Sequence, residues 1–178
     1  MVDGKSIEER VADYDAIRIA SAEQYKVFGI VPCPALGQSV RFTSIGFNHL
    51  VYEAPKKMRD KRAQILRFDM LEKAKFIVET STTYQEYEEE IVYKKVNRRG
   101  AWVPMNVFVR RWGLVAVVRK FRVKVVLVQE GNGTIEFLSV KPGWITAGYR
   151  DMKFYHTSVG NGLGDDGDGE VLKNATIS

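Results

Sequence analysis

The chain has 178 residues, of which 45% are hydrophobic and 28% charged, values typical of a globular protein with one sizeable core. A single cysteine, Cys33, excludes an internal disulfide and argues against a cysteine-based zinc site. No apolar run approaches the length of a membrane span, and the first ten residues lack the apolar segment of a secretory signal, so we expect a cytoplasmic protein without membrane contact.

The net charge of +5 is unevenly distributed. Residues 160–178 hold four acidic residues and one basic residue, which leaves 26 basic and 18 acidic residues in the rest of the chain, a net charge of +8. A basic body favours an anionic partner such as a nucleic acid, a membrane surface or an acidic protein, although solubility alone would account for it equally well. The Gly- and Asp-rich composition of residues 160–178 predicts a flexible acidic tail.

The first predicted element is a helix over about residues 6–26. Ser6 and Glu9 have the spacing of a capping box at its start. The segment "VPCPALG" ends this helix because proline cannot continue it. A short strand is predicted in "SVRFTSIG", and the following "FNHLVYEAPKKMRDKR" predicts a turn or short helix interrupted by Pro55.

The clearest helical pattern covers residues 60–80, with Asp60 as its N-cap. Apolar residues recur there at spacings of three and four, which predicts one buried face. The members of this stripe are Ala63, Leu66, Met70, Ala74 and Ile77.

The rest of the ordered chain reads as strands. "EEIVYKKV" is followed by a turn at residues 97–100, and "VPMNVFVRRW", "GLVAVVRKF", "RVKVVLVQE" and "TIEFLSVKP" are rich in Val, Phe and Ile. The order predicts an α+β fold with N-terminal helices packed on an antiparallel sheet of about four strands. We expect a helical extension over residues 1–36, the α+β domain over 37–159 and the tail over 160–178.

The last two strands are predicted to form a hairpin around the Gly-Asn-Gly of residues 131–133. A turn there places Lys124 opposite Lys141, which is unfavourable unless an anion or an acid lies between them. The lysines therefore indicate either a phosphate-binding spot or two side chains that splay into water. The same register pairs Val125 with Val140, Val126 with Ser139, Leu127 with Leu138, Val128 with Phe137, and Gln129 with Glu136.

Metal-free RNA cleavage needs a base, an acid and cations that steady the phosphorane, while the attacking hydroxyl comes from the RNA. Histidine suits proton transfer near neutral pH, and arginine or lysine can hold the phosphate. The chain supplies such residues around the predicted sheet: His49, Arg59, Arg62, Lys124, Glu136, Ser139 and Lys141.

Two stretches, "IGFNHLVYEAPKKMRDKRAQILRFDMLEKAKFIVETS" and "WGLVAVVRKFRVKVVLVQEGNGTIEFLSVKPGW", together resemble phage-associated members of the barnase/EndoU/colicin/RelE-like nuclease superfamily. The matched features are a His-Leu pair entering a helix with basic residues after it, the basic-hydrophobic "RVKVVLVQ" run, and a Gly-Asn-Gly hairpin ending in "FLSV". The resemblance covers roughly residues 40–145.

The resemblance implies helices followed by a four-stranded antiparallel sheet, and a metal-independent endoribonuclease of the toxin or phage-effector type that needs no cofactor. It places His49, Arg59, Arg62 and Ser139 in the catalytic site, to which hairpin geometry adds Glu136. RNA is the expected partner, with Lys124, Lys141, Arg98 and Arg99 as its contacts, and a toxin of this type would also have a cognate inhibitor protein.

Other interpretations stay open. The family often shows a second His or Arg along the helix where this chain offers only arginines, which leaves room for a non-catalytic nucleic-acid-binding or phage structural module. A third hypothesis is a partner-binding protein whose acidic tail masks its own basic face. Individually, Arg59 and Arg62 could form a solvated helix end, Ser139 could bond the backbone, and Glu136 could pair with Gln129. The three tryptophans are expected in the core or covering the sheet: Trp102, Trp112 and Trp144.

Overall fold

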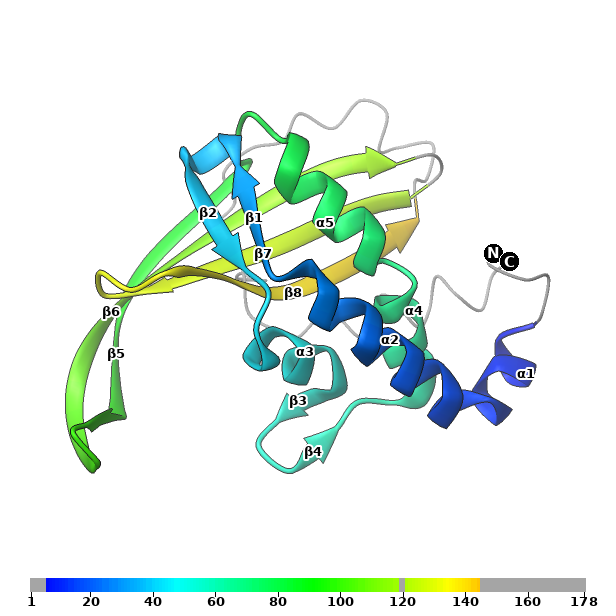
Figure 1. Ribbon diagram of the computed structural model, residues 1–178, viewed down its shortest axis with the longest axis horizontal. Coiled ribbons are helices and arrows are strands. Elements are labelled where there is room, and N and C mark those ends of the chain that lie inside the picture. Colours follow the sequence, from blue (N-terminus) through cyan, green and yellow to red (C-terminus); the bar gives the residue numbers. More distant parts are fainter. Residues whose placement is uncertain (1–5, 119–120, 145–178) are drawn as a thin grey trace.

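The computed structural model describes residues 6–118 and 121–144, which form a mixed α+β fold (Figure 1). The α+β class predicted from the sequence is confirmed, but the main sheet has six strands rather than about four. The helices are α1 (Ile7–Ala12), α2 (Tyr14–Phe28), α3 (Ser44–Val51), α4 (Lys61–Phe68), α5 (Leu71–Thr80) and a short 3-10 helix, η1 (Pro34–Leu36). The strands are β1 (Ile30–Cys33), β2 (Gln38–Arg41), β3 (Tyr52–Ala54), β4 (Lys57–Met58), β5 (Glu86–Arg98), β6 (Ala101–Val118), β7 (Phe121–Glu130) and β8 (Ile135–Trp144).

The main sheet has the strand order β1-β2-β8-β7-β6-β5. Strands β5 to β8 form the predicted antiparallel meander, and the short β1–β2 hairpin joins the far side of β8. The contact between β2 and β8 is parallel and brief, with Val40 beside Ile135 and Arg41 beside Glu136. A separate two-stranded ribbon, β3–β4, follows α3.

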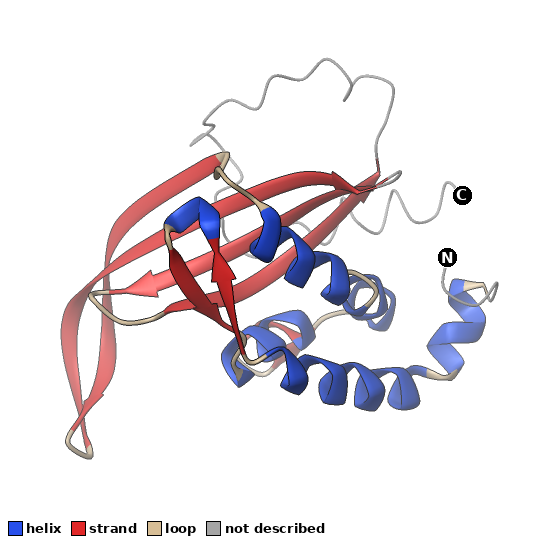
Figure 2. Ribbon diagram, turned by 45° about the horizontal axis from the view of Figure 1, so that its top comes forward, coloured by secondary structure: helices blue, strands red, loops and turns tan. Residues whose placement is uncertain are grey.

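The helices gather on one side of the sheet, as Figure 2 shows. Helix α5 packs on β1, β6 and β7, while α3 and α4 pack on β8. Alternate residues of the central strands face these helices and are buried in one core, among them Val123, Val125 and Leu127 of β7. Tyr14, Tyr25 and Phe28 of α2 belong to the same core.

Each of the two predicted long helices is divided in two. The first ends at Ala12 and resumes at Tyr14, and the second is interrupted at Asp69 and Met70. Arg10 joins the two breaks by donating two hydrogen bonds of 2.6 Å to the Asp69 carboxylate. The predicted caps are confirmed, since Ser6 and Glu9 form a capping box and the Asp60 side chain accepts from the Arg62 amide.

Strand β1 lies within a segment that was expected only to break a helix. Pro32 is in the middle of this strand, where it cannot donate a ladder hydrogen bond. The position is tolerated because β1 is the outermost strand on its side of the sheet and pairs only with β2 among the described residues.

The predicted hairpin register is correct near the strand ends away from the turn. Lys124 lies opposite Lys141, Val125 opposite Val140, and Val126 opposite Ser139. Closer to the turn, the pairing shifts by one residue, so Leu127 faces Phe137 and Val128 faces Glu136. The extra residue, Leu138, forms a β-bulge, which explains why the simple two-residue turn failed to predict these pairs.

The hairpin of β5 and β6 extends well beyond the rest of the sheet (Figure 1). Strand β6 pairs with β7 only from Val109 onward, whereas β5 and β6 remain paired as far as Arg98 and Ala101. Residues 91–108 therefore form a two-stranded projection, here called the arm. Arg99 and Gly100 make its tip, both with positive φ, as a two-residue hairpin turn requires.

Within the described ranges, no helix combines the length and the apolar character needed to cross a membrane. The predicted tail at residues 160–178 and the Trp144 side chain lie outside what the structure describes.

Candidate functional site

His49 lies on α3, a helix held close against β8. Residue 46 of this helix is glycine, and a Cβ there would come within 2.4 Å of the Phe137 carbonyl oxygen. The close approach fixes α3 on the sheet and leaves His49 half-buried near its C-terminal end.

His49 lines an open hollow of about 370 Å³ between α3 and the β3–β4 ribbon. Its lining includes His49, Glu53 and Lys56, residue types that can move protons or hold an anion, and the Glu53 carboxylate forms a 2.6 Å ion pair with Lys57. The complete lining is Asn48, His49, Tyr52, Glu53, Ala54, Pro55 and Lys56. None of the other predicted catalytic residues lines it.

Arg59 and Arg62 have different environments although they are three residues apart. Arg59 is 3% exposed, and its Nε donates a 3.1 Å hydrogen bond to the His49 carbonyl oxygen, so it holds the end of α3 rather than forming a solvated helix end. Arg62 is exposed at the start of α4 and forms a 3.3 Å ion pair with Glu8. Arg59 thus supports the backbone of His49, while Arg62 faces solvent.

Ser139 is buried against Arg67, an arginine without a functional signal in the sequence. Arg67 of α4 is fully buried, and its Nη1 donates to Ser139 Oγ at 2.9 Å and to the Val140 carbonyl oxygen at 2.7 Å. Strand β2 stops pairing with β8 at Glu136, so Arg67 supplies a donor to the edge of β8 that β2 leaves uncovered. This environment gives Ser139 a role in joining α4 to the sheet.

Glu136 lies beside the end of β2, where its carboxylate accepts a 3.3 Å hydrogen bond from Thr43 Oγ1. It does not pair with Gln129, whose amide instead contacts Arg110 and the Gly133 carbonyl. Burial, together with the nearby Glu136 charge, raises the pKa of the Tyr25 phenol.

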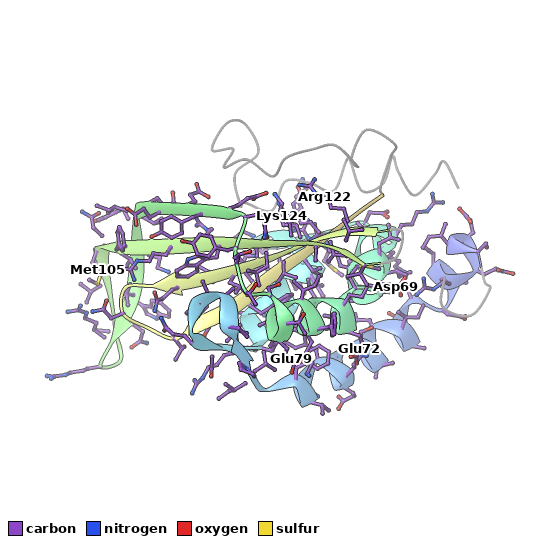
Figure 3. The ribbon with its side chains drawn as sticks, turned by 90° about the horizontal axis from the view of Figure 1, so that it is seen from above. Asp69, Glu72, Glu79, Met105, Arg122 and Lys124 are labelled. Atoms are coloured by element: carbon purple, nitrogen blue, oxygen red, sulfur yellow. The ribbon has the colours of Figure 1, made fainter. Side chains whose placement is uncertain are left out.

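Lys124 and Lys141 lie opposite each other, and an acid lies beside them. Lys124 Nζ is 2.7 Å from a carboxylate oxygen of Glu86, two strands away on β5. Figure 3 shows Lys124 and Arg122 on the side of the sheet opposite the helix that carries Glu72 and Glu79. The Glu86 carboxylate therefore compensates the charge of Lys124. The opposed lysines do not by themselves indicate a phosphate-binding site.

Arg98 and Arg99 lie at the tip of the arm, far along the chain from the hollow. The arm also carries Lys94 and Lys95, and residues 91–108 contain no acidic residue. Four cations are thereby concentrated on one narrow ribbon, although Lys94 forms an ion pair with Glu130 at its base.

Two aromatic rings on the arm are exposed to solvent. Tyr93 is 71% exposed and Trp102 67% exposed, so the expectation that Trp102 is a core or sheet-covering residue is wrong. Both rings lie on the same face of the ribbon, since the register pairs Tyr93 with Asn106 and Asn97 with Trp102. Trp112, by contrast, is in the core as expected.

The structure therefore distributes the predicted site residues over four places. His49 and Arg59 lie at the end of α3, and Arg62 is exposed at the start of α4. The hairpin residues Glu136, Ser139, Lys124 and Lys141 belong to β7 and β8, and Arg98 and Arg99 are on the arm. The residues missed from the sequence are Arg67, Tyr93 and Trp102. The sequence does contain a signal for the arm, because basic residues cluster between Tyr93 and Trp102. Only the lengths of β5 and β6 reveal that this segment projects from the sheet.

Among residues 6–118 and 121–144, no group of three or more His, Cys, Asp or Glu side chains is arranged to hold a metal ion. Comparison of the chain with protein-family models, curated proteins and solved structures found no match.

Proposed function

We propose that this protein binds RNA and that the arm is the element that contacts it. The observation that carries the proposal is the combination of four basic residues, no acidic residue and two exposed rings on a projecting ribbon. Proteins that bind single-stranded nucleic acid commonly combine cations that track the phosphates with aromatic rings on which bases stack. The arm offers both on a surface that a flexible strand can reach.

The composition of the arm also argues against a purely structural projection. A two-stranded ribbon without further packing is only marginally stable in water. Ile91, Tyr93 and Trp102 would be better buried if stability alone determined this segment, yet each is more than half exposed. A bound partner would cover this apolar area while the cations neutralise its phosphates.

Fluorescence anisotropy with a labelled single-stranded RNA of mixed sequence tests the proposal. Arg98→Gln/Arg99→Gln should weaken binding and lower the slope of log K against log salt by about 1.4, since each phosphate contact contributes about 0.7. Trp102→Ala should weaken binding about 5- to 150-fold, which corresponds to about 1–3 kcal/mol per stacked base, with little change in slope.

Arg18→Gln/Lys26→Gln is the matched control, because it removes the same charge from α2, away from the arm. Equal weakening by the arm variant and this control would show that binding depends on net charge and would refute the role of the arm. Lack of RNA binding at low salt by the folded wild-type protein would refute the function itself.

A second candidate function is metal-independent RNA cleavage at the hollow lined by His49. The observation that favours it is the presence of His49, Glu53 and Lys56 around one open cavity, which supplies an acid–base pair and a cation. Cleavage would fit the toxin or phage-type effector that the family resemblance implies, with action on cytoplasmic RNA and a cognate inhibitor as a further partner.

Incubation of labelled total RNA with the protein in EDTA, beside His49→Ala, tests this second function. Cleavage that is strongly reduced in the variant would support it. A folded wild-type protein that binds RNA and leaves it intact would leave the binding function standing and refute cleavage.

A further inference from the structure

Strand β5 is the outermost strand of the main sheet on the side of the arm. Its 13 residues pair with β6 in an unbroken register, and among the described residues its other edge has no partner strand. Such a long and regular edge exposes a row of backbone N–H and C=O groups that another strand can use. Figure 1 shows β5 beside β6 along the whole projecting arm.

The charges along β5 are arranged in order. The first half of the strand carries Glu86, Glu88, Glu89 and Glu90, and the second half carries Lys94, Lys95 and Arg98. An antiparallel copy of the same strand would place its basic half beside this acidic half. The strand is therefore complementary to itself in charge.

We propose that β5 pairs with β5 of a second copy of this chain, antiparallel and about a twofold axis through Val92. A closed symmetric dimer needs one surface patch that complements itself, which β5 supplies. Val92 is the central residue of β5, so all 13 residues of one strand find a partner in the other. The two main sheets then continue into each other.

In this register, three glutamates of one strand lie opposite three basic residues of the other strand. The twofold axis repeats each of these three pairs once more. It places Glu86 opposite Arg98, Glu89 opposite Lys95, and Glu90 opposite Lys94. Twofold axes through Ile91 or Tyr93 would each match only one such pair, so the charge order selects the axis at Val92. Opposite charges directly across a strand pair stabilise it, whereas like charges destabilise it.

The same axis brings together the exposed apolar side chains of the strand. Ile91 would lie opposite Tyr93 on the face that also carries Tyr87, and both side chains are about 70% exposed in one chain, at 69% and 71%. Aromatic and β-branched residues form favourable cross-strand pairs. The dimer would therefore cover apolar surface at the centre of the contact.

Glu89 and Lys95 are the best positions at which to test this contact. Glu90 and Lys94 already form ion pairs within the chain, with Arg111 and Glu130. Glu89 accepts a hydrogen bond from its neighbour Tyr87 and lies opposite Arg110 of β6, and Lys95 is exposed on the same face. A change at either position leaves the ion pairs of the arm in place.

The experiment measures mass in solution by light scattering over a range of concentrations, without RNA. The wild-type protein should reach about twice the 20.2 kDa of one chain. Glu89→Lys and Lys95→Glu should each raise the dimer dissociation constant at least tenfold, because each places like charges opposite each other twice. Glu23→Lys on α2 makes the same charge change at an exposed site away from β5 and should leave the dimer intact.

Mixing the two β5 variants provides the decisive measurement. A Glu89→Lys chain and a Lys95→Glu chain have opposite charges at both paired positions, so the mixture should form a heterodimer although neither variant dimerises well alone. A wild-type protein that remains a single chain at all concentrations would overturn the proposal. A dimer that neither variant weakens, or two weakened variants that do not recover on mixing, would overturn it as well.

The proposal does not rest on RNA binding. The dimer would occupy Lys94, Lys95 and Arg98 of the arm, and Arg99 at the turn and Trp102 on β6 would remain outside the contact because they do not belong to β5. The solution mass is measured without RNA, and failure to dimerise would leave the RNA result unaffected.

Discussion

Replacing Gly46 by alanine should destabilise the protein, although alanine is the better helix former. Gly46 lies inside α3, and a Cβ at this position would be 2.4 Å from both the Phe137 carbonyl oxygen and the Tyr25 hydroxyl oxygen. Ordinary contacts of a Cβ begin at 3.4 Å, so α3 would have to move away from β8 by about 1 Å. The Phe137 oxygen belongs to the backbone of a central strand and cannot rotate aside.

The expected loss follows from two opposing effects. Overpacking of a well-filled core costs about 1–3 kcal/mol. The alanine gains back about 0.5–1 kcal/mol because glycine is unfavourable within a helix. We expect a net loss of about 1–2 kcal/mol in the free energy of unfolding, which would lower the urea midpoint by about 0.5–1 M at a typical slope.

Urea unfolding followed by far-UV circular dichroism measures this change. Asn48→Ala is the control on the same helix, since its side chain is exposed and its replacement should change stability by less than about 0.5 kcal/mol. Tyr25→Phe/Gly46→Ala should remain destabilised, because removing the hydroxyl relieves only one of three clashes and leaves those with the Phe137 carbonyl oxygen and ring. A Gly46→Ala protein as stable as the wild type would show that α3 does not lie as close to β8 as described.

Three further outcomes are expected. Tyr25→Phe should change stability at neutral pH by less than about 1 kcal/mol, because the buried hydroxyl has no hydrogen-bond partner among the described residues. Burial raises the pKa of Tyr25, so the wild type should lose stability as pH rises above 10.0, where the unfolded chain ionises. The variant should lose less stability in a urea series across that pH range. Arg67→Met should lower the free energy of unfolding by about 1–3 kcal/mol, because the Val140 carbonyl would lose this donor. Ser139→Ala should cost less, because the Arg67 bond to Val140 would remain. Equal losses for the two variants in urea unfolding would contradict this expectation. Burial raises the pKa of the Cys33 thiol, so this residue should react with a thiol reagent at pH 8 only after unfolding, and rapid reaction of the native protein would show that β1 opens readily.

The elements with strong local signals could be predicted from the sequence. The Ser6 and Asp60 caps and the meander depend on neighbouring residues, and all are present in the structure. Of the predicted stripe in residues 60–80, Ala63, Met70, Ala74 and Ile77 are buried, whereas Leu66 is half-buried. The pairing of Lys124 with Lys141 was also correct, because it follows from simple alternation along two strands.

Features that depend on distant contacts were missed. Strand β1 contains Pro32, which argues against a strand unless the position at the edge of the sheet is known. Arg67 has the composition of an exposed helical residue, and only the uncovered edge of β8 explains its burial. The sequence predicts two strands separated at Gly113, whereas the structure has one continuous strand, β6. The length of the arm therefore could not be anticipated.

The sequence could predict which residue types a candidate site would contain, but not where in the fold these residues lie. His49 does line a hollow, but Ser139 and Arg59 have the burial and hydrogen bonds of residues that support the fold. Serine and arginine serve both purposes, and the sequence alone contains nothing that separates them. The arm was predicted as a strand and a turn, but its projection from the sheet depends on where β7 ends.

The parallel contact of β2 with β8 has a consequence for the order in which the sheet can assemble. Strands β5 to β8 follow one another through short connections and can pair as they are synthesised, but β2 must wait for a strand that begins 94 residues after it ends. Contacts between residues so far apart in the chain slow folding, because the intervening segment must be ordered before the contact forms. We therefore expect the β1–β2 hairpin to join the sheet last, and a nascent chain that has not yet produced β8 to expose the apolar side chains of α3 and β2.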